Sequence, residues 1–188
     1  MIKSLKPFDS INRNKYSQCH FLLGKFLIEI ISAIVVVSSL VVLAWIDFKT
    51  FQLPDALTIF LSFYGLLANG FLNLGWTDIS SSLIGCVCGY LSLYLLDLAY
   101  LKIKKHHGIG MGDAKLLAGL GACFGWQTLP FILIIASVTG LLGGYIWLKV
   151  HQQDTSHAFP FGPFIALGGI ITLTWLVFNI PINLISRH

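Results

Sequence analysis

The stretch that decides the fold is FLIEIISAIVVVSSLVVLAWI, residues 26–46, in which Glu29 is the one ionisable side chain. A helix of about 20 residues, rising roughly 1.5 Å per residue, crosses the hydrocarbon core of a bilayer. Hydrophobic residues make up 56% of the 188-residue chain and charged residues only 11%, whereas soluble domains carry about 25% charged residues. The mean hydropathy is +0.81. The sequence therefore predicts an all-α, polytopic integral membrane protein.

Five further apolar segments follow, so about six transmembrane helices are expected. They cover residues 56–74, 79–101, 112–126, 128–148 and 160–185. Most are long enough to span the membrane, but the segment 112–126 is marginal, and must be short, thinly covered or partly sheltered by its neighbours. We divide the chain into a basic N-terminal tail, 1–25, and a transmembrane domain, 26–185. The run at 26–46 is too long for a secretory signal and lacks its cleavage pattern.

The longer polar connections, at 47–55, 102–111 and 149–159, are each separated by two apolar segments. Six crossings therefore place all three connections on one membrane face. That face holds Lys49, Lys102, Lys104, Lys105, Lys115 and Lys149. The positive-inside rule makes it cytoplasmic. The tail, with five basic residues, falls on the opposite face, so charge alone leaves the orientation nearly balanced.

Two carboxylates stand out among the ionisable residues. Asp47 ends the first apolar segment and Asp113 opens the fourth, on the same predicted face. A carboxylate at membrane depth costs about 3 kcal/mol and indicates a functional site. Two carboxyl groups held together share one proton, so one can activate water while the other protonates a carbonyl oxygen. This chemistry hydrolyses peptide bonds without a covalent intermediate; proton-coupled transport could use the same pair.

Other polar residues have structural interpretations. Asp55 follows Pro54 and fits the start of a helix. Asp97, near Lys102, can pair or reach the membrane surface. The remaining candidates are Glu29, which is near enough to the interface to reach it, and His106 and His107, which fit a solvated loop.

Other chemistries are not supported by the sequence. It contains neither the H-E-x-x-H motif of zinc proteases nor the G-x-S-x-G elbow of serine hydrolases. The four cysteines lack paired zinc spacing and are interpreted as small apolar side chains; they are Cys19, Cys86, Cys88 and Cys123. No metal, cofactor or nucleic-acid partner is expected.

Glycines recur at a spacing of four, at 85–89, 108–112 and 121–125. Within helices this spacing lets backbones approach closely in lipid. Gly110 and Gly112 precede the fourth helix, where they suit an irregular backbone that passes close to another group.

Three segments, in order, together resemble the type IV prepilin peptidases. GMGDAKLLAGLGACFGW (110–126) resembles their G-x-G-D segment, and IDFKTFQLPDALT (46–58) resembles their first aspartate segment. FPFGPFIALGG (159–169) resembles their late Pro-Phe-Gly-Pro element.

The resemblance implies that Asp47 and Asp113 are the catalytic aspartates of a membrane-embedded endopeptidase without a cofactor. It implies supporting roles for Gly110, Gly112, Lys115, Pro54, Asp55, Pro160, Gly162 and Pro163. The substrates would be prepilin or pseudopilin precursors in the lipid bilayer, cut after a short basic leader, at a Gly before a hydrophobic helix. Cleavage would occur at the cytoplasmic face of the bacterial inner membrane and support type IV pilus or type II secretion assembly. Lys115 would tune the charge near the pair, or lie at the membrane surface with no such role.

The chain departs from long members of that family in one respect. Those members carry an N-terminal insert with paired Cys-x-x-Cys motifs, associated with N-methylation by S-adenosylmethionine, whereas the tail here contains only Cys19. We therefore expect a peptidase without methyltransferase activity. The alternative hypothesis is a non-enzymatic protein, either a proton-coupled membrane carrier or an inactive pilus-assembly subunit.

Overall fold

The computed structural model describes residues 8–71, 76–105, 110–151 and 161–185. The chain divides into two compact units, Met1–Val35 and Val36–His188. The helices are α1 (Phe8–Thr50), α2 (Asp55–Gly70), α3 (Ile79–Lys104), α4 (Met111–Phe124), the short 3-10 helix η1 (Trp126–Thr128), α5 (Leu129–His151) and α6 (Gly162–Ile185). The described ranges contain no strand, so the predicted all-α class is confirmed. The described part of the first unit is helical from Phe8 to Val35, and it includes most of the segment assigned to a basic tail.

Three stretches of the described chain are long and apolar enough to cross a membrane: Leu27–Thr50, Ile79–Lys104 and Trp126–Ile146. The prediction for α2 was too long at its C-terminal end, because the helix stops at Gly70 and has only 16 residues. Helix α6 contributes a shorter apolar stretch, Gly162–Val177.

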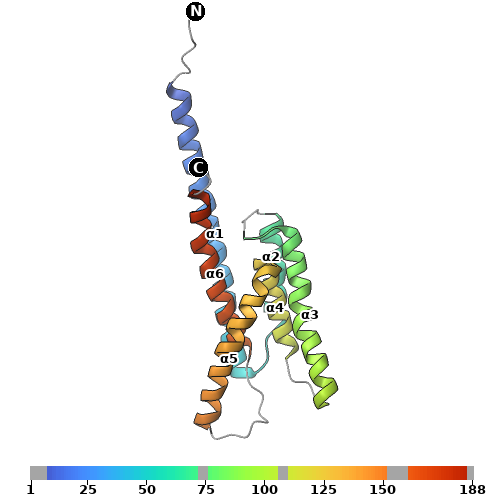
Figure 1. Ribbon diagram of the computed structural model, residues 1–188. Helices are drawn as coiled ribbons and strands as arrows, with labels where there is room; N and C mark the ends of the chain where they lie inside the picture. Colours follow the sequence, from blue (N-terminus) through green and yellow to red (C-terminus); the bar gives the residue numbers. More distant parts are fainter. Residues whose placement is uncertain (1–7, 72–75, 106–109, 152–160, 186–188) are drawn as a thin grey trace, which may run out of the picture. The chain divides into compact units, whose positions relative to one another are not determined.

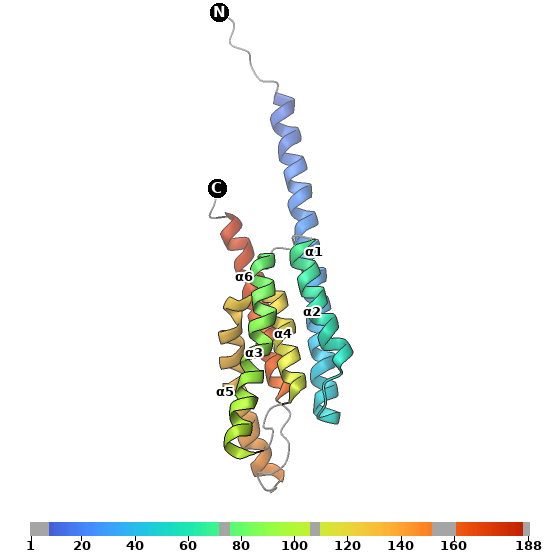
Figure 2. The same ribbon diagram turned by 90° about the vertical axis from the view of Figure 1, so that its right-hand side faces the viewer.

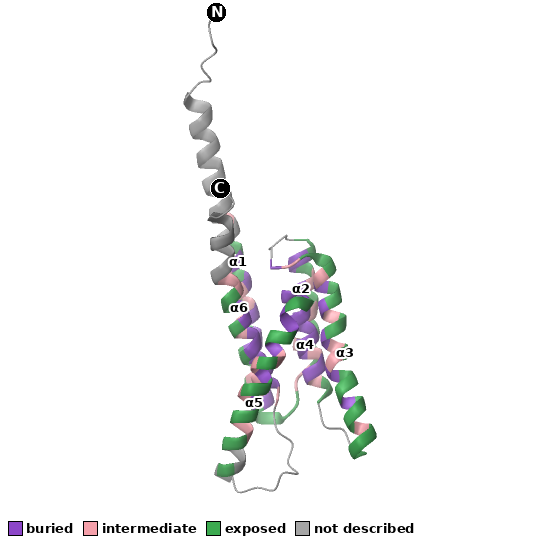
Figure 3. Ribbon diagram, in the orientation of Figure 1, coloured by how far each residue is buried: buried purple, intermediate pink, exposed green. Residues whose placement is uncertain are grey.

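Helix α4 is the centre of the second unit. It has only 14 residues, and every residue from Leu116 to Phe124 is buried. Helices α2 and α3 pack against it, and α6 also contacts it. Figure 3 shows this burial, with exposed residues gathered instead on outer helices such as α3 and α5. The prediction that the short fourth segment is sheltered by its neighbours is therefore confirmed.

The contact between α3 and α4 depends on glycine. A Cβ atom on Gly85 would collide with the backbone carbonyl of Gly121, and a Cβ on Gly121 would collide with the carbonyl of Gly85. One turn along, a Cβ on Gly89 would lie 2.6 Å from the carbonyl oxygen of Leu117. Because backbone meets backbone, the predicted close packing at 85–89 is confirmed.

Polar side chains from neighbouring helices donate hydrogen bonds to the last backbone carbonyl groups of α4 inside the apolar bundle. The Asn69 amide donates hydrogen bonds to the carbonyl oxygens of Ala122 (3.0 Å) and Cys123 (2.9 Å), and the Ser82 hydroxyl donates to Ala122. Gly125 then ends the helix at φ +84°, a conformation that favours glycine. These bonds matter because an unsatisfied carbonyl in a lipid environment costs several kcal/mol. The free carbonyl groups at the end of a helix too short to cross the membrane are thus hydrogen-bonded by side chains of the neighbouring helices.

The helix directions place three junctions at the same end of the second unit. Helices α1, α3 and α5 end there, at Thr50, Lys104 and His151, while α2, α4 and α6 begin there (Figure 1). A view turned by 90° shows the same arrangement (Figure 2). The helix ends that flank the three predicted polar connections therefore lie at this one end.

Candidate active site

Asp47 lies in the last turn of α1 and is 3% exposed. The backbone N–H of Gly162, at the start of α6, donates a hydrogen bond to its carboxyl group. Its Oδ2 atom is buried and has no hydrogen-bond partner among the residues that the structure describes. A buried oxygen of this kind has unused capacity to accept a hydrogen bond from water or from a second acid.

Asp113 lies in the first turn of α4 and is 6% exposed. Its backbone N–H donates to the carbonyl oxygen of Gly110 at 3.0 Å, which starts the helix. The Asp113 carboxyl group lies near enough to Asp47 for the two to interact electrostatically. The structure thus brings together the two carboxylates that the sequence places sixty-six positions apart.

Two glycines hold the backbones close to these carboxylates. A Cβ on Gly162 would lie 2.6 Å from Oδ2 of Asp47, and a Cβ on Gly112 would lie 2.9 Å from Cβ of Leu53. The predicted close approach is found at Gly112, but this residue is the second of α4 and does not belong to an irregular segment before the helix. Gly110 differs, since a Cβ there would lie 3.6 Å from its nearest neighbour, Oδ2 of Asp113, which is an ordinary contact.

Leu53 is the residue of this site that the sequence analysis did not single out. Its side chain faces both Gly112 and Gly162, where a Cβ on the latter would lie 3.1 Å from Leu53 Cδ1. Its position directly before Pro54 was the available signal, but nothing in that motif indicates which helix the leucine contacts.

Lys115 and Asp55 form an ion pair between α4 and α2, with Nζ and Oδ1 2.6 Å apart. The side chains are 32% and 63% exposed, so the pair contributes at most about 1 kcal/mol to stability. Asp55 also opens α2, with Pro54 in the N-cap position, which confirms the predicted helix start. The pairing anchors the beginning of α4 to the beginning of α2, near the two catalytic candidates.

The remaining candidates are placed as follows. Pro163 is the second residue of α6, where a missing N–H does no harm. Asp97 is buried in the second unit. Pro160, His106 and His107 lie outside the described residues.

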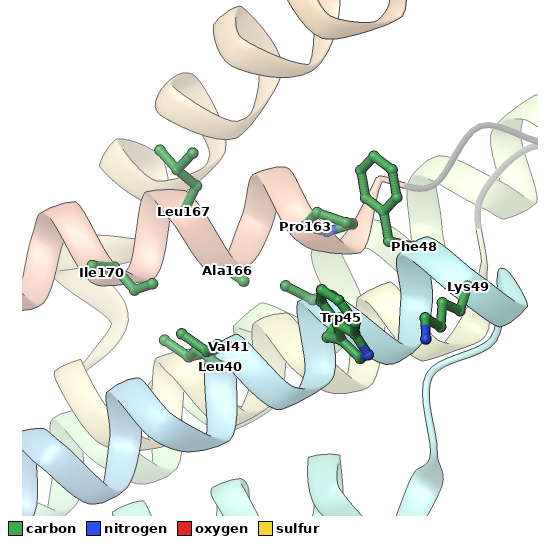
Figure 4. A pocket seen from close by; sticks show the side chains of 10 residues that line it. Leu40, Val41, Trp45, Phe48, Lys49, Pro163, Ala166, Leu167 and Ile170 are labelled. Carbon is green, nitrogen blue, oxygen red and sulfur yellow. The ribbon is translucent and has the colours of Figure 1, made fainter. Parts of the chain in front are cut away.

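An apolar groove lies between α1 and α6, and its lining includes Phe48 and Pro163, the residues that directly follow Asp47 and Gly162 in sequence. Its volume is about 530 Å³. The ten lining residues are Leu40, Val41, Ala44, Trp45, Phe48, Lys49, Pro163, Ala166, Leu167 and Ile170. Figure 4 shows side chains of both helices around this hollow, with Phe48, Lys49 and Pro163 towards one end of it. The ammonium group of Lys49 lies 4.7 Å from the centroid of the Trp45 ring.

Comparison of the amino-acid sequence with known proteins identifies a family. Residues 34–145 match the model of the type IV leader peptidase family. The chain belongs to the type IV leader peptidase family. The matched residues include both Asp47 and the segment from Gly110 to Asp113.

Curated relatives carry the name prepilin leader peptidase/N-methyltransferase. One, from Pectobacterium carotovorum subsp. carotovorum, is 40% identical over 148 residues, which cover 79% of this chain and 52% of the relative. Another, from Legionella pneumophila, is 37% identical over 161 residues, or 85% and 54% of the two chains. A third, from Aeromonas hydrophila, is 42% identical over 148 residues, or 77% and 49%.

The chain spans about half the length of the curated relatives it matches. No solved structure matches the chain. Family membership, the long apolar helices and the overall composition together make it an integral membrane protein.

Proposed function

We propose that the chain is a membrane-embedded aspartic endopeptidase that removes the basic leader from type IV prepilin-like precursors. The observation that carries the proposal is the meeting of two buried carboxylates, Asp47 and Asp113, at one end of the bundle. The names of the relatives support the substrate class, since each is called a prepilin leader peptidase. The products would serve type IV pilus or type II secretion assembly.

The proposed mechanism uses the pair as one acid and one base. The ionised carboxylate takes a proton from a water molecule, which attacks the carbonyl carbon of the scissile peptide bond. The protonated carboxyl group donates its proton to the carbonyl oxygen and so stabilises the developing negative charge. Collapse of the resulting tetrahedral diol breaks the C–N bond, and a proton passes to the leaving amine. Oxygen and protons come from water, so the reaction needs no cofactor.

The groove between α1 and α6 supports a substrate with an apolar helix. Its lining is almost entirely apolar and includes Phe48 and Pro163, the neighbours in sequence of Asp47 and Gly162. A precursor lying along it would present the start of its hydrophobic helix to the two carboxyl groups, with the basic leader beyond the bundle end.

The charge distribution supports an active site at the cytoplasmic face of the bacterial inner membrane. The helix ends beside the aspartates carry Lys49, Lys102, Lys104 and Lys149. Basic residues flanking transmembrane helices favour the cytoplasmic side. This orientation presents the pair to precursors before they leave the cytoplasm.

The proposed activity can be tested with the full chain in proteoliposomes. The added precursor should carry a basic leader, a Gly and then a hydrophobic helix. Mass spectrometry is expected to find cleavage immediately after the Gly, without S-adenosylmethionine. With S-adenosylmethionine present, we expect the same unmethylated product, because the chain contains no Cys-x-x-Cys pair. An uncleaved precursor would contradict the proposal and favour a non-enzymatic assembly subunit.

Gly162→Ala is expected to lower the cleavage rate about 10- to 100-fold, because displacing a catalytic group by a fraction of an ångström to 1 Å has effects of this size. The added Cβ would lie 2.6 Å from Oδ2 and 3.1 Å from Cγ of Asp47, so the carboxyl group must move. The measurement is kcat on the precursor, together with the melting temperature.

Gly70→Ala is the matched control for Gly162→Ala. Its Cβ would lie 2.9 Å from Cδ1 of Ile79, the flexible end of a side chain at the opposite end of the bundle. This variant is expected to keep the wild-type cleavage rate. Equal rates for the two variants would show that the carboxyl group does not depend on the space at Gly162.

A further inference from the structure

Leu53 lies in the turn that joins α1 to α2, three residues after the end of α1. This turn is fixed to the helix turn that carries Asp47. The N–H of Phe51, at φ +53°, donates to the carbonyl oxygen of Asp47 at 2.9 Å, and the Thr50 hydroxyl donates to that of Ile46 at 2.9 Å. Pro54 then restricts Leu53 to an extended backbone. The position of the leucine is therefore coupled to that of Asp47.

The Leu53 side chain faces the backbones that hold both aspartates. Cβ of Leu53 lies 2.9 Å and its Cδ1 3.3 Å from where a Cβ on Gly112 would be, and Gly112 directly precedes Asp113. Cδ1 of Leu53 also lies 3.1 Å from where a Cβ on Gly162 would be, and the N–H of Gly162 contacts the Asp47 carboxyl group. One side chain thus packs against the start of α4 and the start of α6.

We propose that Leu53 is a positioning residue that sets the separation of the Asp47 and Asp113 carboxyl groups. This inference rests on the proposed peptidase function. Gly112 and Gly162 have no side chains of their own, so the bulk that keeps these backbone segments apart is supplied by the leucine. Removing it lets the start of α4 move relative to Asp47 while the substrate groove keeps all its lining residues.

The test compares Leu53→Ala with Leu61→Ala in the full chain reconstituted with a prepilin precursor. Leu61 is a fully buried leucine in α2 that packs against Gly119 of α4, where a Cβ would lie 3.1 Å from its Cδ2. Both variants remove the same three atoms, Cγ and both Cδ, from a leucine that packs against a glycine of α4, but only Leu53 is next to the aspartates. Leu53→Ala is expected to lower kcat about 100-fold with KM within about twofold of wild type, since misplacing a catalytic group by about 1 Å has an effect of that size.

Leu61→Ala is expected to lower the melting temperature at least as much as Leu53→Ala while keeping kcat within about threefold, because a buried leucine contributes to stability wherever it lies. Leu53→Met, which conserves side-chain volume, is expected to restore most of kcat. Leu53→Val removes Cδ1, the leucine atom nearest Gly162, but retains more side-chain bulk than alanine, so it should fold and give an intermediate kcat even where the alanine variant does not fold.

The outcomes separate the two proposals. If the wild type cleaves and Leu53→Ala loses no more kcat than Leu61→Ala, the positioning role is overturned and the proposed function stands. A rise in KM with unchanged kcat in Leu53→Ala or Leu53→Val also overturns it. If the wild type does not cleave, the proposed function fails, and the positioning role fails with it.

Discussion

Asp47→Asn and Asp113→Asn are each expected to lower the rate of prepilin cleavage at least about 10³-fold, within the range that loss of general acid–base catalysis produces. Asparagine keeps the shape of the side chain but cannot ionise or share a proton. With one carboxyl group left, the site has either a base for water or an acid for the carbonyl oxygen, but not both. The two losses should be similar in size and should not multiply in the double variant, because the pair acts as a unit.

The measurement is single-turnover cleavage in proteoliposomes, with size-exclusion profiles and melting temperatures to show that each variant inserts and folds. Asp97→Asn is the matched control, since it also removes a buried carboxylate from the same unit. We expect this control to cleave within a few-fold of the wild-type rate. Cleavage at the wild-type rate by Asp47→Asn or Asp113→Asn would overturn the assignment of the catalytic pair.

Gly85→Ala and Gly121→Ala are expected to produce the largest loss of stability among small substitutions in the bundle. Overpacking a tight contact costs about 1–3 kcal/mol and occasionally more, and here the added Cβ would meet a backbone carbonyl of the facing helix in either case. A backbone cannot rotate away as a side chain can, so α3 and α4 must separate. We expect melting temperatures at least about 5 °C below wild type, at roughly 2–4 °C per kcal/mol for a chain of this size.

Gly24→Ala provides the control for helix propensity. A Cβ at Gly24 would have no atom within 4 Å, and alanine is about 1 kcal/mol better than glycine in a helix interior. This variant should melt at or above the wild-type temperature. Wild-type melting of both Gly85→Ala and Gly121→Ala would contradict the close contact between the two helices.

Much of the fold could be predicted because its signals are local. The apolar run before Asp47 indicates a membrane helix from its length alone, and counting such runs places Asp47 and Asp113 at one end. The glycines at 85 and 89 predict a close helix contact, because a residue without a side chain lets the backbone of any neighbouring helix approach. The helix start at Asp55 likewise follows from its place after Pro54.

The rest depends on which helices meet, and a single sequence does not state this. The early end of α2 brings Asn69 to the carbonyls of Ala122 and Cys123, more than fifty residues away. Apolar pattern alone extends that helix to residue 74, since leucine and phenylalanine continue beyond Gly70. In the same way, Leu53 looks like any apolar residue in a turn until Gly112 and Gly162 are placed against it.

The glycine contact between α3 and α4 also limits how the body of α4 can move against its neighbour. Asp113 belongs to a helix whose backbone is locked against a neighbouring backbone, so sliding or rotating α4 would drive carbonyl groups into each other. Asp47 belongs to α1. The groove between α1 and α6 is lined by side chains, which can change rotamer. Under the proposed function, a peptide is therefore expected to enter between α1 and α6 and not between α3 and α4.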